Sequence, residues 1–329
     1  MVYVGTVSEK ISFGLVVPYF NNQRSINAML NSVLAQSILP CQIVVVDDCS
    51  DFLASEIISE CIKEDLYENC TEFGVIRNPS NLGLAESYNL GIDHIKSDFV
   101  VTMHPDVVLP NANEFEILLK EFAVPGVVAV GHRNIRTSDQ YWNSLTCWEK
   151  AVIAPSESKF AVGFNGQFDA FRKSVALGVG GFRSKIFRTA GEDGDFIMRM
   201  SRCGLIKMST AQAEHRHDFG DKSKFSAGIR KSLQYGNAQG AMARVHGRWF
   251  PLYREALSAV FVALIFVDIN LALLPFSFLL ISILRIPTLV FARDRRIKTF
   301  FALIPYELLR LAAHVIGALS GIIVGRETV

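Results

Sequence analysis

The chain has 329 residues, of which 50% are hydrophobic and only 20% are charged, and its mean hydropathy is +0.27. It is more apolar than a typical soluble domain, so apolar surface remains after one core has been built. The formal net charge of +1 produces no basic field, and we expect no nucleic acid partner. The length suits one large domain with an appendage, or two ordinary domains.

The cysteines form no CxxC pair and no close zinc-type spacing, in a chain too long to need disulfides. We expect reduced thiols in a cytoplasmic compartment. The first dozen residues are mixed and polar, without a charged start followed by an apolar run, so no cleaved secretory signal is expected. The six cysteines are Cys41, Cys49, Cys61, Cys70, Cys147 and Cys203.

The first part of the chain alternates short apolar strand patterns with helical patterns. Such alternation predicts an α/β fold, with a parallel sheet covered by helices on both faces. A ligand is then expected at the carboxyl ends of the strands. The predicted strands are residues 13–17, 42–46, 73–77 and 99–103, and the predicted helices are residues 25–37, 53–66 and 85–95.

Beyond Asn111 the pattern is looser, with a helix expected over residues 114–122, a strand over 127–131 and a glycine-rich stretch over 163–182. From Ala256 onward the composition becomes almost wholly apolar. We place a boundary near Trp249, between a globular part and a hydrophobic C-terminal part. No internal repeat is visible.

Ordered motifs in the first part are the most specific signal of the sequence. They read VVPYFN at 16–21, SVLAQS at 32–37, IVVVDDCSD at 43–51 and NLGLAESYNLG at 81–91. Together they resemble glycosyltransferase family 2, over about residues 12–245. The resemblance implies a GT-A fold, which is a Rossmann-like nucleotide-diphospho-sugar transferase domain. It also implies a hexosyltransferase-type enzyme that moves a sugar from a nucleotide-diphosphate sugar to an acceptor hydroxyl with inversion.

This resemblance predicts the domain organisation of the chain. Residues 1–248 are expected to form the GT-A domain, with a nucleotide-binding half at about 12–110 and an acceptor half at about 111–248. Residues 249–329 are expected to form a hydrophobic, membrane-associated helical region.

The donor site is expected around the first two strands. Pro18 ends the first strand, because it has a fixed φ and no N–H donor, and the loop with Phe20 and Asn21 then wraps a flat base. Asp48 accepts hydrogen bonds from the N–H edge of uracil or guanine, the role that the family implies for the second aspartate. For Asp47, capping of the following helix is an equal alternative. The other predicted donor contacts are Asn81, Gly83, His104 and Glu192.

The predicted strand 99–103 leads into His104-Pro105-Asp106, where the family usually carries Asp-x-Asp. Asp106 is therefore the predicted ligand of a divalent cation that bridges the diphosphate, Mn²⁺ or Mg²⁺. His104 in place of aspartate favours Mn²⁺, which accepts imidazole more readily; its alternative role is a ribose or phosphate contact. His215 and His217 alternate along a strand-like stretch, so either can supply a further ligand, and we assign His217.

Gly191-Glu192-Asp193-Gly194-Asp195 opens an amphipathic helix and resembles the Glu-Asp acceptor motif of the family. An inverting transfer needs one base to take the acceptor proton, and Asp193 is the predicted base. For Asp195 the alternative is an acidic residue that complements the helix dipole.

The apolar stretch 256–284 is long enough to cross a bilayer. A single crossing would put the following arginines outside, against the positive-inside tendency, so we predict a hairpin that turns near Asp268 to Pro275. Residues 299–324 read as an amphipathic helix at the lipid interface, its polar face formed by Glu307, Arg310 and His314. An all-protein helical subdomain or a homo-oligomer contact is the alternative.

We therefore predict a cell-membrane protein with its catalytic domain on the cytoplasmic face, membrane lipids as partners, and a lipid-linked or glycan acceptor. One rival, a sugar-phosphate nucleotidyltransferase, would need a glycine- and lysine-rich loop near the first strand, and residues 16–22 contain neither residue type. The other rival is a catalytically silent nucleotide-binding membrane subunit, favoured by His104 alone.

Overall fold

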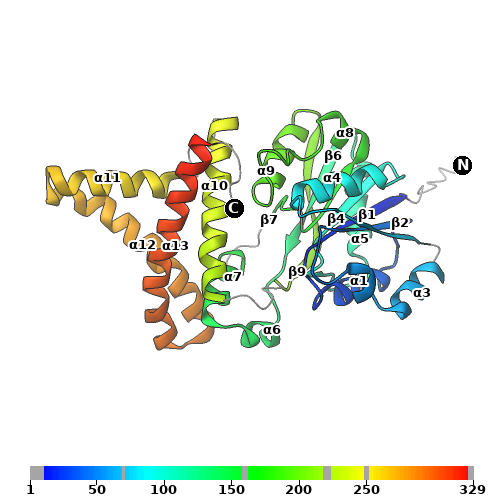
Figure 1. The fold of residues 1–329 in the computed structure, drawn as a ribbon, viewed down its shortest axis with the longest axis horizontal. Coiled ribbons are helices and arrows are strands. Elements are labelled where there is room, and N and C mark those ends of the chain that lie inside the picture. Colours follow the sequence, from blue (N-terminus) through cyan, green and yellow to red (C-terminus); the bar gives the residue numbers. More distant parts are fainter. Residues whose placement is uncertain (1–10, 69–70, 158–161, 218–223, 248–251, 325–329) are drawn as a thin grey trace, which may run out of the picture.

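The computed structural model describes residues 11–68, 71–157, 162–217, 224–247 and 252–324 (Figure 1). Strands β1 to β9 form one sheet in the order β3-β2-β1-β4-β8-β6-β9-β5, with β7 paired to β6. The predicted parallel half is confirmed, because β3, β2, β1 and β4 all pair in parallel. These strands are β1 (Phe13–Tyr19), β2 (Gln42–Asp47), β3 (Glu72–Arg77) and β4 (Phe99–Met103).

The end predicted for the first strand was wrong, since β1 continues through Pro18 and Tyr19, which pair with Val46 and Asp47. Proline fits there because β1 pairs with β4 only as far as Val16. Pro18 therefore has a partner strand on one side only, as proline in a sheet requires.

Helices cover both faces of this parallel half, because alternate strand residues point to opposite faces. Leu15 and Val17 belong to the core cluster under α1 (Ile26–Leu34), α2 (Ala54–Ile57) and α3 (Glu60–Glu68), whereas Val16 packs under α4 (Leu84–His94). One helix was predicted over residues 53–66. The structure divides it in two, since Ile58 has an extended backbone, φ −70° and ψ 113°.

The second half of the sheet is mixed. Strand β8 (Phe168–Arg172) is antiparallel to β4 and β6, and β9 (Leu205–His215) is parallel to β6 (Val127–Asn134). The glycine-rich stretch thus contains β8 and α8, which the sequence did not predict. The other elements are β5 (Val107–Val108), β7 (Val162–Gly163), α5 (Glu114–Leu119), η1 (Lys120–Ala123), α6 (Asp139–Ser144), α7 (Cys147–Glu157), α8 (Lys173–Gly178) and α9 (Glu192–Met200).

Four long helices follow the sheet: α10 (Lys224–His246), α11 (Tyr253–Val267), α12 (Ile269–Asp294) and α13 (Ile297–Ile323). Figure 1 shows α10 and α13 side by side, and α11 and α12 as a hairpin that projects away from the sheet. The turn lies at Asp268, as predicted, where Asp268 Oδ1 accepts a hydrogen bond from Asn270 N at 2.8 Å. The boundary predicted near Trp249 lies outside the described residues.

Glycines let α10 and α13 approach each other closely. A Cβ added at Gly236 or Gly240 of α10 would overlap backbone atoms of His314 or Ala318, and one at Gly317 or Gly321 of α13 would overlap backbone of α10. The polar face of α13 is therefore turned toward protein. Part of the apolar surface of α13 is exposed, namely Phe301, Leu308, Leu309, Ile316 and Leu319, whereas Leu303 and Leu311 are buried.

A buried ion pair joins the C-terminal helices to the sheet domain. Lys150 Nζ of α7 lies 2.9 Å from the carboxylate of Asp294 at the end of α12, which also accepts a hydrogen bond from Trp142 Nε1 at 2.6 Å. Arg293, in the last turn of α12, donates to Asp139 and to the Thr137 carbonyl. Helices α12 and α13 are nevertheless long and apolar enough to cross a membrane, by length and composition.

Candidate active site

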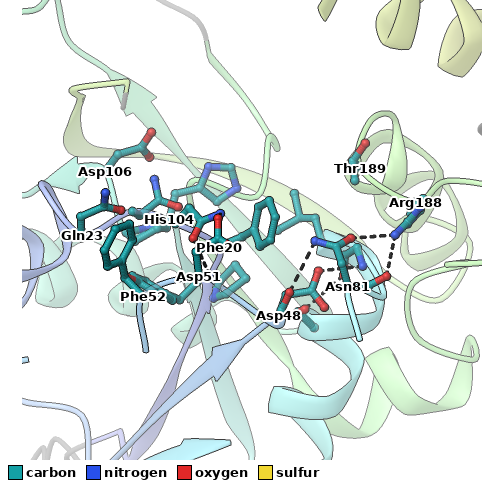
Figure 2. A pocket seen from close by; sticks show the side chains of 18 of the residues that line it. Phe20, Gln23, Asp48, Asp51, Phe52, Asn81, His104, Asp106, Arg188 and Thr189 are labelled. Carbon is teal, nitrogen blue, oxygen red and sulfur yellow. Dashed lines mark hydrogen bonds between the residues drawn. The ribbon is translucent and has the colours of Figure 1, made fainter. Parts of the chain in front are cut away.

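A cleft of about 820 Å³ opens at the carboxyl ends of β1, β2 and β4, where an α/β sheet binds ligands (Figure 2). It brings together most of the predicted site residues: Pro18, Phe20, Asn21, Asp48, Asn81, Gly83, His104, Asp106 and His217. Of the remaining two, Asp193 lines a neighbouring pocket, and Glu192 is buried beside it at the start of α9.

The loops that follow β1 and β2 are joined by hydrogen bonds at one end of the cleft. Asn21 Nδ2 donates to Asp51 Oδ2 at 3.2 Å, and Asp51 N donates to Asn21 Oδ1 at 2.8 Å. Asn21 has φ 54°, a left-handed conformation that asparagine tolerates better than most residues. The rings of Phe20 and Phe52 lie beside this junction, 44% and 52% exposed (Figure 2). Exposed rings at a cleft offer flat apolar surfaces for a nucleobase.

Asp48 holds the loop that starts α4. Its Oδ1 accepts from Leu82 N at 2.8 Å and from Asn78 Nδ2 at 2.7 Å, and its Oδ2 accepts from Gly83 N at 2.8 Å. Since a carboxylate oxygen accepts more than one hydrogen bond, Oδ2 retains capacity for a ligand N–H. The base-binding role of Asp48 stays a prediction.

Asp47 contacts the start of the following helix, which is the alternative role predicted for it. Its carboxylate accepts from Ala54 N, the first N–H of α2, at 3.2 Å and from Ser50 N at 2.9 Å, and it pairs with Arg77 at 2.7 Å. Asp47 therefore accepts a hydrogen bond from the N-terminus of α2, although Leu53 occupies the N-cap position.

Arg188, which sequence reasoning missed, supplies a cation to the cleft. Its Nη2 donates to the backbone oxygen and to Oδ1 of Asn81, both at 2.6 Å (Figure 2). Gly83, the N-cap of α4, has φ 94° and leaves no room for a Cβ beside Arg188. A guanidinium next to a helix N-terminus is a suitable place for phosphate. No local motif marked Arg188, because it lies 107 residues from Asn81 in the chain.

His104, Asp106 and His215 form a group whose potential ligand atoms all lie within 4.8 Å of one another. The sheet assembles it: β5 follows Asp106 directly, and Val107 pairs with His215 at the end of β9. His215 Nε2 lies 3.1 Å from Asp106 Oδ1. His217 Nδ1 lies 3.3 Å from Asp106 Oδ2, but its Nε2 lies 2.6 Å from Lys231 Nζ. Of the two alternate histidines, the geometry thus groups His215 with the cluster.

The protonation of His104 and Asp106 suits a metal ion. His104 Nε2 is buried and has no hydrogen-bond partner among the described residues. Burial lowers the pKa of His104 to about 4 and that of His217 to about 3. Burial alone would raise the pKa of Asp106, but His215 and His217 hold it well below its usual range. Neutral imidazoles and an ionised carboxylate are the forms that bind metals.

A buried chain of hydrogen bonds supports His215 from behind. Its Nδ1 lies 2.9 Å from Gln167 Nε2, and Gln167 Oε1 accepts from Asn134 Nδ2 at 3.0 Å. Asn134 Oδ1 lies 2.9 Å from His132 Nε2, and His132 Nδ1 lies 3.0 Å from Asp169 Oδ1. A partner on the second nitrogen of a histidine fixes its ring orientation and tautomer. Metal ligation through His215 Nε2 requires the side-chain amides of Gln167 and Asn134 to be turned over, so that Gln167 Oε1 accepts from Nδ1–H.

Replacing Gln167 by leucine should weaken Mn²⁺ binding about 10- to 100-fold, because His215 loses the partner that orients it. Mn²⁺ titration followed by electron paramagnetic resonance measures this without any assay of activity. The matched control is Gln239→Leu, which lies outside the cleft and the hydrogen-bond chain. Equal Mn²⁺ affinity in wild type and Gln167→Leu would contradict the role of Gln167.

Asp193 lies in the first turn of α9, after Gly191 with φ 78°. Its Oδ1 accepts from Gly194 N at 2.6 Å. Burial, reinforced by the charge of Asp169, raises the pKa of Asp193 to about 6. Asp195, by contrast, is fully buried and paired with Arg199 at 2.7 Å and His246 at 2.8 Å, which gives it a structural role. A carboxylate with a pKa near neutrality suits a general base.

The mixed α/β sheet with a cleft at the carboxyl ends of its parallel strands is that of the GT-A class of fold. Residues 15–182 match the model of Glycosyl transferase family 2, and the chain belongs to this family.

Two curated relatives match parts of the chain. An uncharacterized glycosyltransferase of Haemophilus influenzae is 30% identical over 92 residues, which are 28% of each chain. An uncharacterized protein of Mycobacterium tuberculosis is 26% identical over 202 residues, which are 56% of this chain and 60% of the relative. The chain thus spans less than two thirds of the length of either relative.

Two solved structures resemble the fold. One is the mannosyltransferase PcManGT from Pyrobaculum calidifontis in complex with GDP-Man and Mn²⁺, at 17% identity and TM-score 0.56, covering 96% of this chain and 88% of that one. The other is GalNAc-T7 with UDP, GalNAc and Mn²⁺, at 13% identity and TM-score 0.50, covering 74% and 53%.

Proposed function

We propose that this chain is a membrane-associated, inverting glycosyltransferase that moves a sugar from a nucleotide-diphosphate sugar to an acceptor hydroxyl. The observation that carries the proposal is that His104 and Asp106 of the metal-ligand group line the same cleft as two exposed phenylalanine rings and Arg188. Family membership argues against the nucleotidyltransferase alternative.

The base, diphosphate and sugar of the donor are assigned to successive parts of the cleft. The base stacks on Phe20 or Phe52, with Asp48 or Asp51 accepting its N–H groups. The diphosphate lies between Arg188 at the N-terminus of α4 and the metal-ligand group. The sugar then points toward Thr189, Gln234 and α9.

The ligand set of two imidazoles and one carboxylate favours Mn²⁺ over Mg²⁺. Held by these residues, the ion would neutralise charge that develops on the departing diphosphate. The two similar solved structures both contain Mn²⁺, which agrees with this choice.

Asp193 is the proposed base. In its ionised form it accepts the proton of the acceptor hydroxyl while that oxygen attacks the anomeric carbon opposite the diphosphate. One carboxylate at the acceptor side is what a single displacement with inversion requires. The backbone N–H of Gly194 holds the Asp193 carboxylate in place.

The α11–α12 hairpin is the proposed membrane anchor. Its tip exposes Phe266 and Val267, at 85% and 77%, and apolar side chains of α12 such as Leu271 and Phe278 are also exposed. Large exposed apolar patches mark contact with lipid or protein. Exposed Arg295, Arg296 and Lys298 would meet anionic headgroups and keep the catalytic domain on the cytoplasmic face.

The test uses the full chain in detergent. Thermal shifts are measured with UDP, GDP, dTDP and CMP, each with and without Mn²⁺, and donor hydrolysis is followed for the nucleotide that binds. A Mn²⁺-dependent shift together with slow donor hydrolysis supports the transferase. Binding without hydrolysis or transfer would instead indicate the silent nucleotide-binding subunit, and no shift for any nucleotide would overturn the proposal.

A further inference from the structure

A second pocket of about 360 Å³ is lined by Asp193 of α9 and by residues of α10 and α13. Figure 1 shows α9 beside α10, and Gly191 makes this approach possible, because a Cβ there would press on Ala238. The volume is in the range of small-molecule sites, about 300–1,000 Å³. Its lining residues are Gly191, Asp193, Ser232, Tyr235, Ala238, Gln239, Met242, Glu307, Arg310 and His314.

The pocket adjoins the donor cleft. Thr189 and Gln234 line the donor cleft, and their near neighbours in the chain, Gly191 and Tyr235, line the second pocket. Asp193 therefore stands where a ligand in the second pocket would present a hydroxyl to the sugar of a donor.

The charges of the pocket exclude an anionic ligand. Asp193 and Glu307 are carboxylates, and the cation among the lining residues is Arg310. Arg310 Nη1 lies 2.6 Å from Glu307 Oε1, and its N–H groups also reach Ser232 Oγ and the Ala151 carbonyl at 3.0 Å. The guanidinium is thus neutralised and occupied in holding α13. A phosphate would meet the carboxylate of Asp193 and find no unpaired arginine or lysine among the residues that line the pocket.

The uncharged groups suit a sugar. His314 Nε2 and Gln239 Oε1 lie 3.0 Å apart, and both side chains bring hydrogen-bonding atoms to the pocket. Tyr235, 46% exposed, and Met242 add apolar surface to the lining. A pyranose has hydroxyls around its rim and an apolar C–H face, so polar atoms beside an aromatic ring match its surface.

We infer that this pocket is the acceptor site and that it binds a neutral saccharide, not the phosphate of a lipid carrier. The inference rests on the proposed transferase activity. Of the two acceptor classes that the sequence left open, lipid-linked and glycan, it selects the glycan. A lipid-linked glycan also fits, provided that its sugar end enters the pocket and its phosphate stays outside.

Saturation-transfer NMR on the full chain in detergent tests the assignment. The probes are methyl glycosides of glucose, galactose, mannose and their 2-acetamido forms, and geranyl phosphate as the phosphate-bearing probe. We expect at least one glycoside to bind, and Tyr235→Ala and Gln239→Leu each to raise its Kd by about tenfold. The matched control is Tyr253→Ala, an exposed tyrosine that lines neither pocket.

Three results would overturn the inference: binding of geranyl phosphate that depends on Tyr235, no binding of any glycoside, or glycoside affinity that is unchanged by both substitutions. Melting temperatures of the variants check that they fold. Failure of the proposed function is separate, since it appears as absent nucleotide binding in the first cleft while glycosides still bind in the second.

Discussion

Replacing Asp106 by alanine should abolish Mn²⁺-dependent nucleotide binding and lower sugar transfer more than about 100-fold. The basis is that even loss of a residue behind a metal ligand costs up to about 100-fold. Asp106 is the carboxylate of the group and lies 3.1 Å from His215 Nε2. The measurements are the nucleotide thermal shift and the initial rate of nucleotide release, each with and without Mn²⁺.

The matched control for Asp106 is Asp93→Ala, an exposed aspartate on α4 that lies outside the cleft. Its thermal shift and rate should equal those of wild type. Asp106 is buried beside two histidines, so the melting temperature without nucleotide must also be compared. A folded Asp106→Ala variant that keeps its Mn²⁺-dependent shift would remove Asp106 from the metal site.

Replacing Asp193 by asparagine should lower the transfer rate by about 10²- to 10⁴-fold, the range for loss of a general base. Nucleotide affinity should stay unchanged, because Asp193 lies outside the donor cleft. The measurements are kcat with saturating donor and acceptor, and Kd for the nucleotide by calorimetry. The matched control is Glu116→Gln, an exposed carboxylate on α5.

The pKa of Asp193 also predicts how the transfer rate of the wild type depends on pH. Burial raises the pKa of Asp193 to about 6, and the base works only when ionised. The rate should therefore be level above that pH and fall as pH decreases through about 6, approaching tenfold per pH unit. An acid limb of the same pKa that persists in the residual activity of Asp193→Asn would assign the base to another group, with Glu192 the nearest candidate.

Local order in the chain was sufficient to predict the parallel half of the sheet. Short β-branched runs between amphipathic helical segments specify buried strands and their covering helices, because burial of both faces requires that pattern. The same reasoning placed Asp48, His104 and Asp106 at strand ends and therefore at one edge of the sheet. It also placed the hairpin turn at Asp268, a polar residue between two apolar helices that caps the second of them.

The composition of the site depended on contacts that no local pattern records. Arg188 and Gln167 enter it through long-range hydrogen bonds. The choice between His215 and His217 followed from the pairing of Val107 with His215 and from the position of Lys231. The polar face of α13 likewise suggested a lipid interface, yet glycines on both helices let it pack against α10 and line a pocket. Periodicity shows that a helix has two faces, whereas the partner of each face is decided by packing across the whole chain.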